Sequence, residues 1–120
     1  MVKKTLVLGA SENTARYSNM AVKKLAAYGH PVIAIGRRAG NIDGIPISKT
    51  PVEENAIDTV TLYLNPGNQE PYYDYILSLN PKRIIFNPGT ENSDLERIAK
   101  ESGIETLEAC TLVMLSTGRY

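Results

Sequence analysis

The chain has 120 residues, of which 42% are hydrophobic and 22% are charged, values that are typical of one globular domain. Its 13 basic residues balance its 13 acidic ones, which excludes the broad positive field of a general nucleic-acid binder. Cys110 is the only cysteine, so an internal disulfide is excluded. No apolar run approaches the ~20 residues of a membrane span, and no signal-peptide pattern precedes the first strand. We therefore expect a single cytoplasmic domain over residues 1–120 that binds neither membrane nor nucleic acid.

The first strand and the loop after it predict an anion site. Leu6–Leu8 is an apolar run of the kind found in strands that are buried on both faces. Small and polar residues follow, and a helical pattern begins near residue 18. The backbone N–H groups of such a loop and the dipole of the helix both favour a negative charge. We therefore predict that a phosphate of a nucleotide-type ligand lies against Gly9, Ala10, Ser11, Arg16, Ser18 and Asn19.

The glycine pattern of this loop is incomplete. A G-x-G-x-x-G loop would have further glycines two and five residues after Gly9, where the chain has Ser11 and Thr14. The Walker pattern is absent as well, because no Gly-Lys-Ser/Thr follows. The loop is thus Rossmann-like in position but not in glycine content. The alternative interpretation is a polar loop with a Ser or Asn helix cap.

A second candidate phosphate contact follows the second strand. Helical spacing predicts a helix over Ser18–Tyr28 that ends at Gly29, and the apolar stretch Pro31–Gly36 predicts a buried parallel strand. In nucleotide-binding βαβ units, an acid at the end of this strand binds the ribose hydroxyl, whereas an arginine accommodates a phosphate. Arg37 and Arg38 stand at this point, so we expect them to bind a phosphate. The alternative is a solvated basic pair on a loop.

The next stretch predicts a turn, a short helix and a third strand. Asp43-Gly44 is a turn signal, and Ile45–Ile47 suits a short extended edge piece. Thr50 is followed by a proline and two acids, which is typical of the start of a short helix. The third strand is then expected over Ile57–Leu64.

The second half of the chain repeats the strand–loop–helix pattern. A helix is expected from Asn68 to Leu79, and its tyrosines Tyr72, Tyr73 and Tyr75 either pack against the core or stack on a base or a partner. Packing is the simpler interpretation. The later elements are a fourth strand over Pro81–Phe86, a helix over Ser93–Gly103, a fifth strand over Ile104–Leu107 and a final segment over Leu112–Leu115.

The pattern as a whole predicts an α/β fold. We expect a Rossmann-like doubly wound parallel sheet of five strands in the order 3-2-1-4-5, with helices on both faces. Ligands bind such sheets at the carboxyl ends of the strands, and the loops rich in glycine, proline, asparagine and serine all fall at that edge. This edge adds candidate binding residues from three further loops: Gly36, Arg37, Arg38, Asn65, Pro66, Asn87, Pro88 and Gly89.

The order and spacing of several segments resemble a known family. Gly9–Ser11, Arg16–Asn19 and Tyr28–Val32 look like the corresponding segments of the small single-domain CoA-binding proteins, which are similar to the CoA-binding domain of the succinyl-CoA synthetase α subunit. Further similar segments are the turn Ile42–Pro46, the loop Asn87–Asn92 and Glu108–Thr111 with its late cysteine. The resemblance covers the chain from about Lys4 to Leu115.

The resemblance implies a Rossmann-type fold that binds CoA or an acyl-CoA. It places the first loop at the phosphates of the ligand and the residues after the second strand near the adenosine. The chain departs from the family in having Ile35-Gly36-Arg37 where a Val-Asn-Pro is usual, and no proline near Glu12. Arg37 and Arg38 would suit the 3′-phosphate of CoA, and they would equally suit the 2′-phosphate of NADP.

Groups for catalysis are scarce in the sequence. His30 is the only histidine, and its place before the second strand puts it at the edge opposite the expected ligand site. Cys110 therefore lacks a histidine partner, and one cysteine with one histidine makes no metal site. We expect a binding module without catalytic residues of its own. The alternatives are a small NADP-dependent reductase and a regulatory nucleotide-binding subunit. The expected ligand is a small nucleotide-type molecule, and the protein could also form a homo-oligomer or bind a partner protein.

Overall fold

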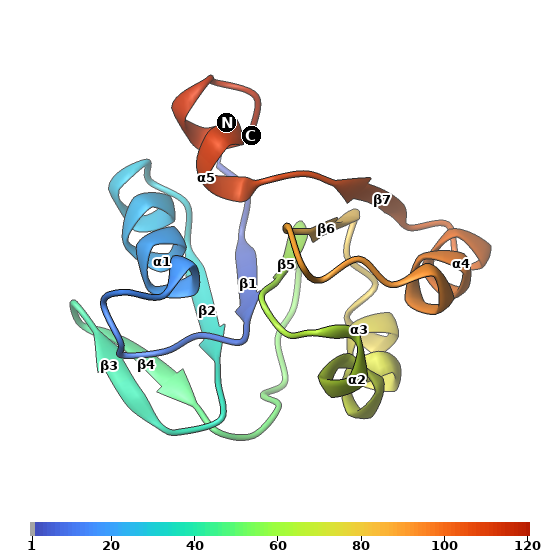
Figure 1. Ribbon diagram of the computed structural model, residues 1–120, viewed down its shortest axis with the longest axis horizontal. Helices are drawn as coiled ribbons and strands as arrows, with labels where there is room; N and C mark the ends of the chain where they lie inside the picture. Colours follow the sequence, from blue (N-terminus) through green and yellow to red (C-terminus); the bar gives the residue numbers. More distant parts are fainter. Residues whose placement is uncertain (1) are drawn as a thin grey trace.

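Within residues 2–120, which the structure describes, the computed structural model has one sheet of seven strands with helices on both faces (Figure 1). The strands are β1 (Thr5–Leu8), β2 (Val32–Ile35), β3 (Gly40–Ile42), β4 (Ile45–Ser48), β5 (Thr59–Leu62), β6 (Arg83–Phe86) and β7 (Glu105–Glu108). Their order across the sheet is β3-β4-β2-β1-β5-β6-β7, and every neighbouring pair is parallel except β3 and β4. The expected α/β, Rossmann-like class is confirmed.

The prediction of five strands in the order 3-2-1-4-5 is wrong. The turn at Asp43-Gly44 joins β3 and β4 into an antiparallel hairpin, and β4 pairs with β2. This hairpin occupies the edge of β2 where we expected the third long strand to lie. That strand, β5, therefore pairs with β1 on its other side, with Thr5 opposite Thr59.

The helices agree with the prediction only in part. They are α1 (Tyr17–Ala27), α2 (Pro66–Gln69), the 3₁₀ helix η1 (Glu70–Tyr72), α3 (Tyr73–Leu79), α4 (Ser93–Glu101) and α5 (Thr111–Ser116). The single helix expected over residues 68–79 is divided, because Pro71 lies in η1 and has no N–H to donate. The helix expected at Thr50 does not form, and Ala56 in this stretch has a positive φ of 60° that no α-helix accommodates. None of the helices within residues 2–120 is long and apolar enough to span a membrane.

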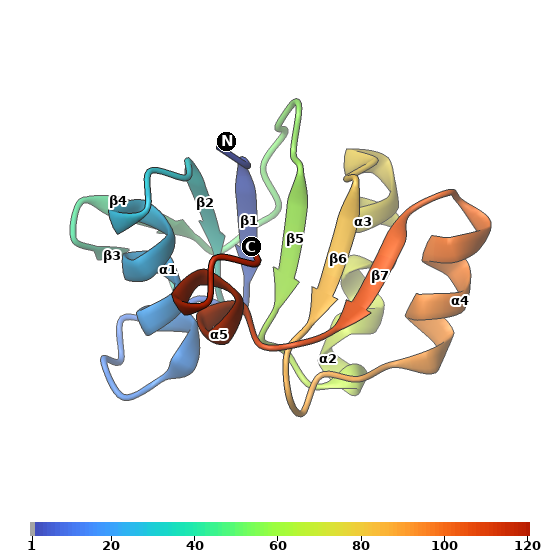
Figure 2. The same cartoon turned by 90° about the horizontal axis from the view of Figure 1, so that it is seen from above.

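Each face of the sheet has its own core, because successive side chains of a strand point to opposite faces. On one face, Val7 and Ala34 pack with α1 and α5 through residues such as Val22, Leu25 and Leu115. The other face is covered by α3 and α4 (Figures 1 and 2). Leu6 and Leu8 belong to the core on this face. This second core also includes Ile76, Leu95, Ala99 and the half-buried tyrosines Tyr72, Tyr73 and Tyr75. The tyrosines thus pack against the core, as the simpler interpretation of the sequence expected.

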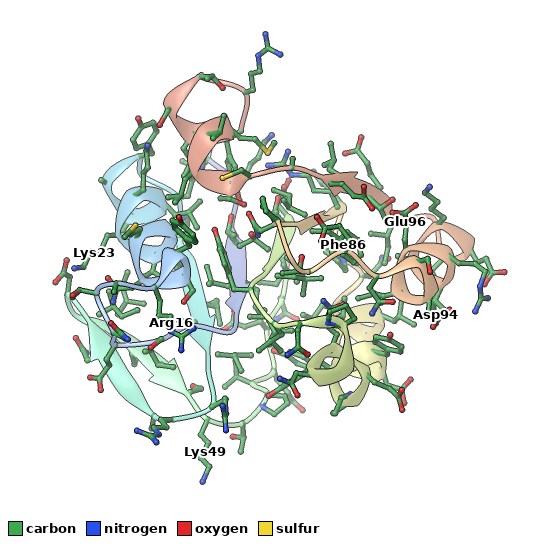
Figure 3. The ribbon with its side chains drawn as sticks, viewed as in Figure 1. Arg16, Lys23, Lys49, Phe86, Asp94 and Glu96 are labelled. Carbon is green, nitrogen blue, oxygen red and sulfur yellow. The ribbon has the colours of Figure 1, made fainter. Side chains whose placement is uncertain are left out.

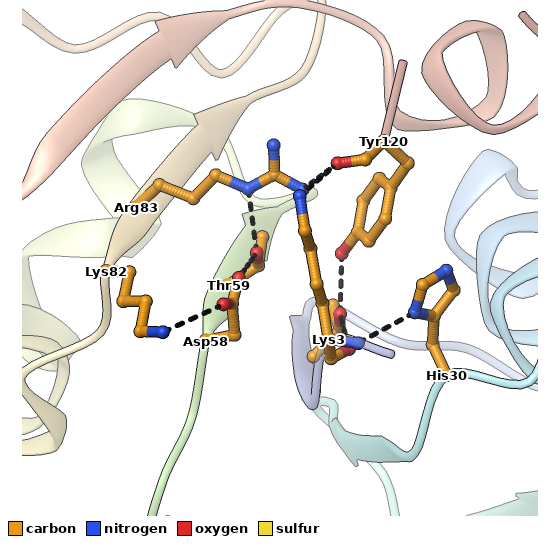
Figure 4. Close-up of polar contacts among 8 residues, drawn as sticks. Lys3, His30, Asp58, Thr59, Lys82, Arg83 and Tyr120 are labelled. Atoms are coloured by element: carbon orange, nitrogen blue, oxygen red, sulfur yellow. Dashed lines mark hydrogen bonds and ion pairs between the residues drawn. The ribbon is translucent and has the colours of Figure 1, made fainter. Parts of the chain in front are cut away.

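The amino ends of the strands carry a separate polar cluster (Figure 4). Arg83 is only 8% exposed; its Nε donates to Thr59 Oγ1 (2.8 Å), and an Nη donates to the backbone oxygen of Tyr120 (3.0 Å). The ring of Tyr120 lies 4.5 Å from the guanidinium carbon of Arg83 and 4.9 Å from the ring of His30. His30 Nδ1 accepts the backbone N–H of Lys3 (2.9 Å). His30 therefore lies at the amino edge of the sheet, where the sequence predicted it.

Candidate functional site

A cavity of about 810 Å³ lies across the carboxyl ends of β2, β1, β5 and β6. All four strands end at the same edge of the sheet, at the bottom of Figure 2. The walls of the cavity come from four loops: residues 9–18 after β1, 37–38 after β2, 63–68 after β5 and 88–90 after β6. The volume falls within the range of about 300–1,000 Å³ that is usual for small-molecule sites. The cavity lies where the sheet changes direction, because β1 connects to β2 on one side and β5 to β6 on the other.

The loop after β1 is held in place by its own backbone and by α1. Gly9 has a φ of 103°, a conformation that favours glycine, and its N–H donates to the backbone oxygen of Ile35 (2.8 Å). Asn13 Oδ1 accepts the N–H of Ala15 (3.0 Å), which forms a local turn. Asn19 Nδ2 donates to the backbone oxygen of Ser11 (2.9 Å) and ties the loop to the helix. Contacts within the chain thus fix the shape of the loop.

The amino end of α1 opens into this cavity without a cap. Arg16 occupies the N-cap position, no side chain caps the helix, and no acid lies in its first turn. The N–H groups of Tyr17 and Ser18 donate to no acceptor within residues 2–120. Four N–H groups at the start of every helix lack partners in the helix itself, so these groups and the dipole remain available for an anion.

The amino end of α4, unlike that of α1, is capped by its own chain. Its N-cap Asn92 accepts the N–H groups of Asp94 (3.1 Å) and Leu95 (3.2 Å), and two acids, Asp94 and Glu96, follow in the first turn. Figure 3 shows both acids on α4, well away from Arg16 at the start of α1. The amino end of α4 is therefore satisfied by its own chain, whereas that of α1 is not.

Three arginines line the cavity, and all are exposed. Arg16, Arg37 and Arg38 make no ion pair with an acid within 4.0 Å among residues 2–120. The one acid in the cavity wall is Glu12, whose carboxylate accepts the backbone N–H of Asn41 (3.0 Å). The cavity is therefore positively charged, although the chain as a whole has no net charge.

The far wall of the cavity is built by a buried amide network. Gln69 Nε2 donates to the backbone oxygens of Leu64 and Thr90 (both 2.8 Å), and Gln69 Oε1 accepts from Asn92 Nδ2 (2.9 Å). Asn65 caps α2 by accepting the N–H of Asn68 (3.0 Å). These contacts join the loops after β5 and β6 to each other.

Most of the predicted site residues line the cavity, and four do not. Those that line it are Gly9, Ala10, Ser11, Arg16, Ser18, Arg37, Arg38, Asn65, Pro88 and Gly89. Asn19 and Asn87 are buried and bond to the protein itself, Pro66 is the first residue of α2, and Gly36 lies beneath the loop after β1. Whether the lining residues contact a ligand stays a prediction.

Sequence reasoning missed several lining residues. They are Glu12, Asn13, Tyr17, Tyr63, Leu64, Asn68 and Thr90. Glu12 and Asn13 belong to the predicted loop, so its boundaries contained the signal. Tyr63 and Leu64 are the last two residues of the third predicted strand, and the loop was expected to begin only after them. The hydroxyl of Tyr63 is buried with no hydrogen-bond partner within residues 2–120, and burial raises the pKa of this phenol.

The site and the fold together define a class: a Rossmann-like domain with a positively charged cavity at the carboxyl ends of its strands. The chain belongs to the family described as "CoA binding domain", which matches residues 3–116. No protein with curated annotation matches the chain.

Several solved structures have the same fold. One, described as the crystal structure of an uncharacterized protein, is 52% identical with a TM-score of 0.97, and the match covers 100% of this chain and 99% of the other. A hypothetical protein from Pyrococcus horikoshii OT3 is 21% identical with a TM-score of 0.87, covering 96% of this chain and 82% of the other. A conserved hypothetical protein from Pyrococcus furiosus is 23% identical with a TM-score of 0.81, covering 92% and 97%. The two Pyrococcus structures are similar in fold alone.

Proposed function

We propose that this protein is a binding module for CoA or an acyl-CoA and that the ligand occupies the cavity at the carboxyl ends of β2, β1, β5 and β6. Membership of the CoA-binding family supports the class of ligand. The observation that carries the proposal is the uncapped amino end of α1, which has Arg16 at its N-cap position and opens into that cavity. A positive side chain beside a helix amino end is unfavourable unless an anion offsets it.

The charges of the cavity fit the charges of CoA. CoA has a pyrophosphate and a phosphate on its ribose, and the cavity offers two groups of donors. The free N–H groups of Tyr17 and Ser18 with Arg16 would hold the pyrophosphate. Arg37 and Arg38 would hold the ribose phosphate, because guanidinium groups match phosphate oxygens in a bidentate way. The wall from Tyr63 to Asn65 is left for the uncharged pantetheine arm.

The proposal assigns no catalytic residue. His30 lies at the amino edge of the sheet, where its Nδ1 bonds to the backbone of Lys3. The titratable groups in the cavity wall are Glu12, the arginines and two tyrosines, and Glu12 already bonds to Asn41. The function that the cavity supports best is therefore recognition of the ligand.

NADP binding is the second candidate, and the arginine pair after β2 is what favours it. An arginine in this position accommodates the 2′-phosphate of NADP in dinucleotide-binding folds. One observation counts against NADP binding: the loop after β1 lacks the second and third glycines of the dinucleotide-binding pattern.

Isothermal titration calorimetry with CoA, acetyl-CoA, NADP, NAD and ATP tests both candidates, with thermal unfolding as the second measurement. We expect CoA species to bind and to raise the melting temperature, since a ligand that binds only the folded state stabilises it. Preferential binding of NADP would favour the second candidate. No heat and no stabilisation with any CoA species at millimolar concentration would refute the proposal.

A further inference from the structure

Two loops of the cavity are in direct contact at Gly36. The N–H groups of Gly9 and Ala10 both donate to the backbone oxygen of Ile35 (2.8 and 2.9 Å). A Cβ on Gly36 would overlap the backbone oxygen of Ala10. The loop after β1 therefore rests directly on the end of β2, and only a residue without a side chain fits at this point.

A second contact joins the same loops at Gly40. A Cβ on Gly40 would overlap the side chain of Glu12, whose carboxylate accepts the N–H of Asn41 (3.0 Å). The φ of Gly40 is not in the left-handed region, so an alanine there would not strain the backbone but would push the Glu12 side chain away from its place beside Asn41. We call the contacts of Ala10 with Gly36 and of Glu12 with Gly40 and Asn41 the loop clasp.

The loop clasp encloses the arginine pair. Arg37 and Arg38 lie between the two glycines, and both their side chains line the cavity and are exposed. Glu12 is the one acid that lines the cavity, yet its carboxylate bonds to the backbone of Asn41 and forms no ion pair with either arginine. The clasp thus holds the backbone on both sides of the arginines while their guanidinium groups stay free for an anion.

We infer that Glu12 is a positioning residue that, through the loop clasp, holds Arg37 and Arg38 at the place of the ligand's ribose phosphate. The inference rests on the proposed function and deepens it. A guanidinium binds a phosphate well only when its approach is fixed, because ordering a free loop on binding costs affinity. The protein therefore selects CoA over 3′-dephospho-CoA, which lacks the ribose phosphate, and Glu12 sustains this selectivity without touching the ligand.

The test compares two ligands and three variants by calorimetry. Wild-type protein is expected to bind CoA at least about tenfold more tightly than 3′-dephospho-CoA, as one charge-assisted contact implies. In Glu12→Ala and Gly40→Ala we expect CoA to bind about tenfold more weakly, with less than a twofold change for 3′-dephospho-CoA. Glu12→Gln removes the negative charge but retains a carbonyl oxygen for the N–H of Asn41, so it should keep at least the wild-type preference for CoA over 3′-dephospho-CoA.

Gly67→Ala is the matched control, because its Cβ would meet nothing closer than Asn65 Oδ1 at 3.6 Å. It should leave the ratio unchanged. Thermal unfolding without ligand establishes whether each variant folds. If Gly40→Ala fails to fold, Glu12→Ala still tests the inference. Equal weakening of both ligands, or an unchanged ratio in both Glu12→Ala and Gly40→Ala, would overturn the inference. Wild-type protein that binds CoA and 3′-dephospho-CoA equally would overturn it while the proposed function stands, and wild-type protein that binds neither would overturn both.

Discussion

Asn87 Oδ1 accepts a hydrogen bond of 2.9 Å from the backbone N–H of Thr111, 24 residues further along the chain. Its Nδ2 donates to Leu62 O (2.8 Å) and to Thr61 Oγ1 (2.6 Å). One buried amide thus joins the end of β5, the end of β6 and the start of α5. Its donors and acceptors are engaged by the protein, which points to a structural role beneath the cavity.

We expect Asn87→Ala to lower the free energy of unfolding by about 2–3 kcal/mol, because it leaves buried backbone groups of Leu62 and Thr111 without partners. Urea unfolding measures the change. Asn55→Ala, at an exposed position, is the control and should change stability by less than about 0.5 kcal/mol. Equal stability of the two variants would contradict the structural role.

Arg16→Ala should weaken CoA binding by about 1.5–3 kcal/mol, the usual range for a hydrogen bond to a charged group. The protein without ligand should be as stable as wild type or slightly more stable, since the substitution removes a positive charge from the amino end of α1. Calorimetry and thermal unfolding measure the two effects.

Lys23→Ala is the control for Arg16→Ala, because it removes one positive charge from the same helix. Lys23 lies on the outer side of α1 and does not line the cavity (Figure 3). Its removal should change CoA affinity by less than twofold. If both variants bind CoA as tightly as wild type, the phosphates do not lie at the amino end of α1.

The stability of the protein should fall at acid pH partly through His30. Burial, followed by the positive charge of Lys3, lowers the pKa of His30 below its usual value of about 6.5. Below that pH the unfolded chain takes up the proton more readily than the folded one, so stability is fully present above pH 6.5 and is lost as pH falls through the pKa of the folded state. Protonation also removes the acceptor of the Lys3 N–H.

His30→Asn isolates this effect, because asparagine offers an acceptor oxygen but does not titrate. We expect the midpoint of urea unfolding to depend less steeply on pH between about 7.5 and 5 in the variant than in wild type. Parallel curves for the two proteins would show that His30 does not contribute to the acid sensitivity.

Removal of the hydroxyl of Tyr63 and removal of the hydroxyl of Tyr75 should change the stability of the protein differently. Tyr63→Phe deletes a buried hydroxyl that has no partner within residues 2–120, so stability should stay the same or rise by up to about 1 kcal/mol. Tyr75→Phe deletes the donor to the backbone oxygen of Val52 (2.6 Å), so stability should fall by about 1 kcal/mol. Urea unfolding of both variants makes the comparison, and a loss in Tyr63→Phe as large as in Tyr75→Phe would contradict it.

Local patterns predicted the long parallel strands and the first and fourth helices, because the causes of these elements are local. Leu6–Leu8 forms a strand buried on both faces, and α1 ends close to Gly29, as the spacing of apolar residues indicated. The order of the strands was mispredicted because it depends on which edge of β2 remains open. Whether Ile45–Ile47 pairs with β2 is a long-range matter that its own residues do not determine.

The cavity could be located from the sequence, but not the division of roles within it. All the polar loops follow the carboxyl ends of strands, so their residues gather at one edge by topology alone. Asn65 and Asn87 look alike in the sequence, yet one caps α2 at the cavity wall and the other is buried beneath it. Glu12 was passed over because its partners, Gly40 and Asn41, are remote in sequence.

The contact between Lys3 and Tyr120 has a use for protein engineering. The Lys3 ammonium donates to the backbone oxygen of Tyr120, so the start of β1 and the last residue lie within reach of each other (Figure 4). A short glycine–serine linker can therefore join the ends, and the Asp43-Gly44 turn offers an exposed place to open the chain. Such a circular permutant would carry its new ends on the β3–β4 hairpin and leave the strand order intact.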